Sequence, residues 1–211
     1  MRIGRNSGIP RSEIRRFAGL GVSAFAKRDV TSYVSTKYFI PVHSLARASL
    51  MASITALLHT ENDGLRLGRA LETLYACDDL LIVDHGSRDS TVRVAHEYGA
   101  RVVDAALGFP PQQYLQFART EWILSLDPCE SLTEKLAASL FEWKSESWQT
   151  AGYAPAFSVF LREETARGWR EISAAHTRLV PQSWKLWAGR FPIDEPSARA
   201  LEGEVLRFSF P

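Results

Sequence analysis

Three short apolar runs in the first part of the chain each end in a cluster of polar residues. The runs span residues 53–59, 80–83 and 122–126, and the polar clusters that follow them span 60–63, 84–89 and 127–130. A helical pattern follows each cluster, and strands that alternate with helices in this way predict a mostly parallel sheet with helices on both faces. Ligands of such sheets bind beyond the carboxyl ends of the strands, so the three clusters predict one binding edge.

The helices are expected from apolar residues at helical spacing and from residues that can cap them. Asn62 is expected to cap the first helix and Asp89 the second, which ends at Gly99, and the sequence at 131–134 predicts a capping box for the third. The apolar positions are Leu67, Leu71 and Leu74 in the first helix, Val92, Ala95 and Tyr98 on the inward face of the second, and Leu136, Leu140 and Phe141 in the third. A weaker strand is expected at 101–103.

After about residue 145 the pattern changes. Short alternating segments interrupted by Gly and Pro predict antiparallel strands and loops. We therefore expect an α/β protein with a mostly parallel sheet flanked by helices and a smaller antiparallel, loop-rich C-terminal part.

Charge divides the chain unevenly. Residues 1–50 carry nine Lys and Arg against two acidic residues, a charge of +7, so the remainder carries −6. This asymmetry predicts a basic N-terminal extension, 1–50, which is either a tail or sequence upstream of a true start at Met51, and a domain at 51–211. The extension contains no nucleic-acid-binding motif, so no nucleic-acid partner is expected. Two cysteines are too few for a disulfide framework and indicate a reducing compartment.

The polar clusters and their flanking strands carry a resemblance to a known family. ITALLHTEND at 54–63 and LIVDHGSRDST at 81–91 resemble the start of the family 2 glycosyltransferases. WILSLDPCE at 122–130 is similar to the Trp-Ile-Leu-x-Leu-Asp-Ala-Asp-Glu segment of a subgroup related to lipopolysaccharide core β-glucosyltransferases. The likeness covers about residues 52–208 and is strongest from 54 to 142.

The resemblance implies a GT-A fold that transfers a sugar, with inversion, from a nucleotide-sugar donor of the UDP type to an acceptor hydroxyl. It implies a glycan or lipid-linked acceptor and a role in the synthesis of cell-envelope polysaccharide or glycolipid, such as lipopolysaccharide. A cytoplasmic location, with peripheral contact at the inner face of the membrane, would accompany that role. The nucleotide-binding half would be 52–145 and the acceptor-side half 146–211.

The resemblance also implies roles for individual residues. Thr60, Asn62, Asp84 and Ser87 would surround the nucleotide. Asp127 and Glu130 would hold the diphosphate through Mg²⁺ or Mn²⁺, since hard cations prefer carboxylate oxygens. Inversion requires a general base for the acceptor hydroxyl, and Asp194 and Glu195 are the candidates for it.

The chain departs from the subgroup at the metal motif. Cys129 occupies the position of the second aspartate, and a thiol favours softer metals than Mg²⁺. The His of a later His-Glu pair is also missing. An alternative is therefore a catalytically degenerate GT-A-fold protein that acts as a binding or scaffold module. A nucleotidyltransferase is disfavoured, because residues 57–64 offer one Gly and no Lys or Arg for a phosphate-binding loop.

Overall fold

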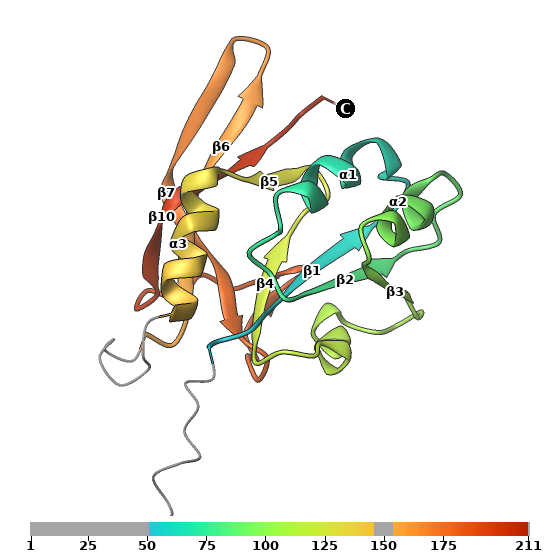
Figure 1. Ribbon diagram of the computed structural model, residues 1–211, viewed down its shortest axis with the longest axis horizontal. Coiled ribbons are helices and arrows are strands. Elements are labelled where there is room, and N and C mark those ends of the chain that lie inside the picture. The colour runs from blue at the N-terminus through green and yellow to red at the C-terminus, as the bar shows by residue number, and fades with distance from the viewer. Residues whose placement is uncertain (1–50, 146–153, 211) are drawn as a thin grey trace, which may run out of the picture. The chain divides into compact units, whose positions relative to one another are not determined.

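The computed structural model describes residues 51–145 and 154–210, and the predicted extension 1–50 lies outside them (Figure 1). The first half contains β1 (Ile54–Thr60), α1 (Gly64–Glu72), β2 (Asp79–Asp84), α2 (Thr91–Glu97), β3 (Arg101–Asp104), the 3₁₀ helix η2 (Pro111–Phe117), β4 (Trp122–Leu126), β5 (Glu130–Leu132) and α3 (Glu134–Ser145). The second half contains β6 (Phe157–Thr165), β7 (Gly168–Pro181), β8 (Trp187–Ala188), β9 (Phe191–Pro192) and β10 (Arg199–Arg207).

One sheet joins both halves. Within the described residues it has eight strands in the order β3-β2-β1-β4-β7-β6-β10-β5, and β8 and β9 form a small antiparallel pair. β1 lies parallel to both β2 and β4, and β2 lies parallel to β3. The expected mostly parallel α/β architecture, flanked by helices and with an antiparallel C-terminal part, is confirmed.

The parallel strands end at one edge, which we call the carboxyl edge. Thr60 of β1 lies opposite Asp84 of β2 in the register, and β4 ends at Leu126, opposite Leu58. The predicted convergence of the three polar clusters therefore follows directly from the strand pairing.

Alternation along the strands separates two cores. Ile54, Ala56 and Leu58 face a core that includes α1, α2 and α3, whereas Leu57 faces a second core with Tyr114 of η2. Trp184 and Trp187 pack against this second core. By the same alternation, His59 lies on the face of the second core, where its ring contacts Tyr114.

β6 and β7 form a long antiparallel hairpin, in which β6 also pairs with β10 up to Glu163 and the tip projects beyond the other strands (Figure 1). Only the C-terminal end of β7 pairs with β4, where Leu124 lies opposite Leu179. Since β7 begins at Gly168, its first half extends beyond the carboxyl edge. In residues 51–145 and 154–210, none of the helices has the length and apolar character needed to cross a bilayer.

Three details of the helices differ from expectation. The residue before α1 is Asp63, so Asn62 does not cap the helix and instead adopts a left-handed conformation with φ of 57°. Tyr98 is 43% exposed rather than inward. The predicted capping box is wrong, because Ser131 belongs to β5 and the Thr133 hydroxyl accepts the hydrogen bond from the Leu136 amide at 3.3 Å.

Asp89 comes closer to its expected role. Its carboxylate accepts a hydrogen bond from the Thr91 amide, the first of α2, at 2.9 Å. Ser90 is the residue that immediately precedes the helix, and its side chain makes no capping bond. The first amide of α2 is therefore bonded to Asp89, which lies one residue before the N-cap position of Ser90.

Candidate active site

The loops that follow β1 and β2 are tied together at the carboxyl edge. The His85 amide donates to the Thr60 carbonyl at 2.8 Å, and the Asn62 amide donates to the Ser87 hydroxyl at 2.9 Å. In return, the Arg88 amide donates to Asn62 Oδ1 at 2.9 Å. These reciprocal bonds give the two loops one shared conformation.

Asp84 organises this pair of loops. Its carboxylate is 4% exposed at the residue level and accepts hydrogen bonds from the Thr60 hydroxyl at 3.1 Å and the Ser87 hydroxyl at 2.5 Å. The amides of Gly86 and Ser87 donate to its other oxygen at 3.2 and 2.9 Å. The structure thus brings Thr60, Asp84 and Ser87 into direct contact, with Asn62 bonded to the same serine.

His59 and Arg190 lie beside these loops, and the sequence did not single them out. His59 is 2% exposed; its Nδ1 lies 3.0 Å from His85 Nε2, and its own Nε2 is buried without a hydrogen-bond partner in the described residues. Burial, followed by the neighbouring His85 and Arg190, lowers the pKa of His59 to about 4, against a smaller opposing effect of Asp127. Arg190, in the turn between β8 and β9, places Nη1 3.5 Å from the His59 carbonyl.

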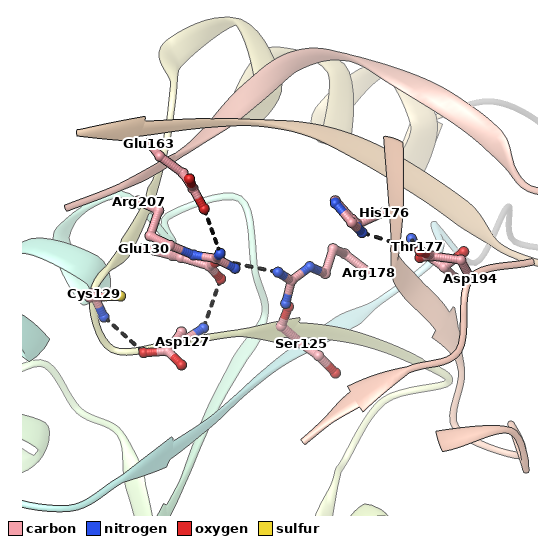
Figure 2. A network of polar contacts seen from close by, with 10 residues as sticks. All are labelled: Ser125, Asp127, Cys129, Glu130, Glu163, His176, Thr177, Arg178, Asp194 and Arg207. Atoms are coloured by element: carbon pink, nitrogen blue, oxygen red, sulfur yellow. Dashed lines mark hydrogen bonds and ion pairs between the residues drawn. The ribbon is translucent and has the colours of Figure 1, made fainter. Parts of the chain in front are cut away.

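Glu130 lies at the centre of a buried ionic network (Figure 2). It is fully buried; one of its oxygens accepts hydrogen bonds from Arg178 Nη2 at 3.1 Å and from Arg207 Nη2 at 2.8 Å. The other oxygen accepts the Asp127 amide at 2.9 Å. Arg207 also donates to Glu163 at 3.0 Å. The Glu130 carboxylate therefore holds two arginines and the turn after β4, instead of standing open to a cation.

Arg178 is the buried cation of this network. It is 3% exposed, its guanidinium lies 3.7 Å from the centre of the Phe191 ring, and its Nη1 is 3.5 Å from the Ser125 carbonyl. Burial lowers the pKa of Arg178, while Glu130 acts in the opposite direction. Asp127 and Asp194 also lie within electrostatic range of this guanidinium.

Cys129 stands between the two acidic residues of the cluster. Its amide donates to Asp127 Oδ1 at 3.3 Å. Burial, and next the negative charge of Asp127, raises the pKa of the Cys129 thiol to about 12. The side chain that replaces the second aspartate is thus a neutral thiol at ordinary pH.

Asp194 and Glu195 have different surroundings. Asp194 accepts the Thr177 amide at 2.7 Å, and its other oxygen lies 3.2 Å from His176 Nδ1 (Figure 2). Glu195 instead accepts from the Ser197 hydroxyl at 2.5 Å, and this bond lowers the pKa of its carboxyl. The structure therefore separates the two candidate bases into a carboxylate paired with histidine and a carboxylate engaged in a local turn.

The donors around Asp127 do not match the expected Mg²⁺ or Mn²⁺ site. Hard cations bind carboxylate oxygens, but Cys129 supplies sulfur and both Glu130 oxygens are hydrogen-bonded to protein groups. In the part of the chain that the structure describes, no three His, Cys, Asp or Glu side chains are grouped to hold a metal ion. Of the predicted pair, Glu130 is held in ion pairs, whereas Asp127 makes no ion-pair contact within the described residues.

Sequence relatives match about two fifths of the chain. An uncharacterised glycosyltransferase of Rickettsia felis is 35% identical over 92 residues, which are 41% of this chain and 32% of the relative. Another, of Rickettsia bellii, is 36% identical over 93 residues, 41% of this chain and 31% of the relative. The match thus spans about a third of these relatives' length. The broad resemblance to glycosyltransferases is supported, whereas the narrower lipopolysaccharide subgroup stays a prediction.

Solved structures resemble the chain in part. A mycobacterial protein shares 15% identity with a TM-score of 0.49, covering 74% of this chain and 65% of that one. Staphylococcus aureus TarS shares 14% identity with a TM-score of 0.41, covering 62% and 28%. No family profile matches the sequence.

Proposed function

We propose that the domain at 51–211 is the sugar-transferring part of a glycosyltransferase that uses a nucleoside-diphosphate sugar. The observation that carries this proposal is the convergence of Thr60, Asp84 and Asp127 at the ends of three parallel strands. Ligands of open α/β sheets bind at this kind of edge. The segment shared with the Rickettsia glycosyltransferases supports the same activity.

The nucleotide is assigned to the joined loops after β1 and β2. Asn62 is exposed and Ser87 half-buried on these loops, and Thr60 and Asp84 hold the shape of the loops beneath them. Because both Asp84 oxygens already accept hydrogen bonds, this carboxylate acts chiefly by fixing the backbone that faces the ligand. A UDP-type donor remains our proposal for the nucleotide.

Asp127 is assigned to the donor's sugar, and Glu130 to positioning. Glu130 fixes Asp127 through the Asp127 amide and holds Arg178 and Arg207 beside it. A carboxylate at the strand end can accept hydrogen bonds from sugar hydroxyls, which orients the anomeric carbon. The Mg²⁺ or Mn²⁺ expected from the resemblance is not part of this assignment, because the donor set around Asp127 does not match it.

Asp194 is assigned as the general base, in preference to Glu195. An acceptor hydroxyl must lose its proton as it attacks with inversion, and a carboxylate can take that proton. Asp194 is paired with His176, which can share the proton, and lies within range of Arg178. Glu195 is tied to Ser197 and has a lowered pKa, so it is the poorer base.

We also propose, from the resemblance, the kind of acceptor and the cellular location. They comprise a glycan or lipid-linked acceptor, a role in the cell envelope, and a cytoplasmic location at the inner face of the membrane. The β6–β7 hairpin, in which β7 extends past the end of β4, is the segment that we assign to contact with such an acceptor.

Hydrolysis of UDP-sugars by the purified full chain tests the proposal. We expect release of UDP from at least one UDP-sugar, and loss of that release in Asp127→Asn. The matched control is Glu97→Gln, an exposed acidic residue on α2. Binding of UDP without any turnover in wild type would favour the alternative, a catalytically degenerate binding module, whose motivating observation is Cys129. Absence of UDP binding would refute both.

A further inference from the structure

We infer that the donor diphosphate is bound by arginine guanidinium groups, with Arg190 making the direct contact, and that its binding requires no divalent cation. This inference rests on the proposed function, since it concerns the same nucleotide-sugar. It follows from a disagreement between the metal site implied by the resemblance and the side chains at the carboxyl edge.

The first observation is that the carboxylates expected to hold a cation are not free to bind one. A cation that bridges two phosphates is usually held by one or two carboxylates of the protein. Here Glu130 is fully buried and binds both Arg178 and Arg207, and a sulfur atom takes the position of the second aspartate. Asp127 alone is left, and the guanidinium of Arg178 lies within its electrostatic range.

The second observation is that the carboxylates around Asp127 are already balanced by arginines. Arg178, Arg190 and Arg207 are the cations, and Asp127, Glu130 and Asp194 are the anions within electrostatic range of them, so the two signs are equal in number. Because each of these carboxylates is matched by a guanidinium group, no excess of negative charge is left to attract a dication.

The third observation is the position of Arg190. The turn between β8 and β9 brings it to the end of β1, 131 residues away in sequence, and Gly189 supplies the left-handed conformation that the turn needs, with φ of 59°. Its hydrogen bond within the described residues is the 3.5 Å contact with the His59 carbonyl, which is at the limit of a hydrogen bond. Arg190 is half-buried, which restricts the position of its guanidinium group. The remaining N–H groups of this guanidinium can still donate hydrogen bonds to a ligand.

Arg178 and Arg207 differ from Arg190 in this respect. Both donate to Glu130, and Arg207 also donates to Glu163. Their donors are bonded to carboxylates, whereas Arg190 can form the paired N–H bonds that suit phosphate oxygens.

The test is UDP binding to the full chain, measured by calorimetry in excess EDTA and again with Mn²⁺. We expect the same affinity in both conditions. Arg190→Gln should weaken UDP binding about 10- to 100-fold, which is typical of a lost bond to a charged group, and Arg190→Lys should recover part of the loss. Uridine, which lacks phosphates, should bind wild type and Arg190→Gln equally.

Arg93→Gln is the matched control, because Arg93 is an exposed arginine on α2 that pairs with Glu97. It should leave UDP binding unchanged. UDP binding that appears only with Mn²⁺ would overturn the inference and leave the proposed function standing. An Arg190→Gln variant with wild-type affinity would also overturn it. Failure of UDP to bind in either condition would refute the inference together with the proposed function.

Discussion

Arg178 and Glu130 form a buried ion pair, with Nη2 3.1 Å from Oε1 and side-chain exposures of 4% and 0%. The pair joins β7, in the second half of the chain, to the short strand that follows the turn after β4. Burial of two charges is favourable only when each keeps a partner, so the pair makes the carboxyl edge sensitive to the loss of either residue.

Glu130→Gln should destabilise the fold strongly. Removing one partner of a buried ion pair leaves an uncompensated charge on Arg178, which costs about 3 to 5 kcal/mol. Urea denaturation measures the change in the free energy of unfolding. Glu97→Gln, which breaks an exposed pair on α2, should cost no more than about 1 kcal/mol. Equal losses in the two variants would contradict the buried network.

Gly203→Ala should cost more than Gly99→Ala. Both glycines have positive φ, 94° and 73°, so each alanine incurs a left-handed penalty of about 1 to 2 kcal/mol. A Cβ at Gly203 would also lie 2.3 Å from the Leu136 amide nitrogen, whereas a Cβ at Gly99 meets nothing within 4 Å. Overpacking against backbone adds about 1 to 3 kcal/mol. Thermal denaturation of the two variants compares these costs, and a smaller loss at Gly203 would argue against the close packing of β10 on α3.

His59 should make the fold less stable in mild acid. Its pKa is lowered from 6.5 to about 4 in the folded state, so the unfolded chain takes up the proton first as pH falls. Stability from the neutral imidazole is therefore complete above pH 6.5 and is lost between that pH and 4. This group alone should lower the free energy of unfolding by about 2 kcal/mol between pH 7 and pH 5.

The His59→Phe variant isolates this effect, because an aromatic ring still fills the site but cannot take up a proton. Its free energy of unfolding should change less than that of wild type between the two pH values. Carboxylates with a lowered pKa take up protons only at more acidic pH. They are present in both wild type and the variant, so they do not affect the difference between them. Identical pH profiles would show that His59 does not carry the dependence.

Asp194→Asn should abolish most turnover while donor binding is kept. The amide still offers an oxygen to the Thr177 amide but cannot take a proton, so kcat should fall about 10²- to 10⁴-fold. Glu195→Gln should have a much smaller effect, because that carboxylate bonds to Ser197 in a surface turn. Turnover and UDP affinity, measured for both variants, separate the two roles. A larger kcat loss in Glu195→Gln would reverse the assignment of the base.

The parallel half of the fold could be predicted from sequence because its signals are local. β1, β2 and β4 are apolar runs that end in polar residues, and the pairing of parallel strands then brings Thr60, Asp84 and Asp127 to one edge. β5 was not predicted. It has three residues, and its first, Glu130, is a buried carboxylate in a sequence that is typical of a helix start.

The rest of the candidate site depends on contacts that sequence spacing does not reveal. Arg178 meets Glu130 across 48 residues, and Arg190 reaches the His59 carbonyl across 131. His59 lies within an apolar run and receives no role from the resemblance, so only its buried, partly unsatisfied ring marks it. The preference for Asp194 over Glu195 likewise comes from their partners, His176 and Ser197, rather than from their order in the chain.

The pairing of β5 with β10 has a consequence for how the protein is made. On the ribosome, β5 emerges long before β10, and Glu130 precedes Arg207 by 77 residues. Until those later residues leave the exit tunnel, the Glu130 carboxylate lacks one of its two arginines and β5 lacks its strand partner. Such long-range pairing must wait for loop closure, which slows folding. The nascent first half is therefore expected to depend on chaperones or on delay until the last strand is synthesised.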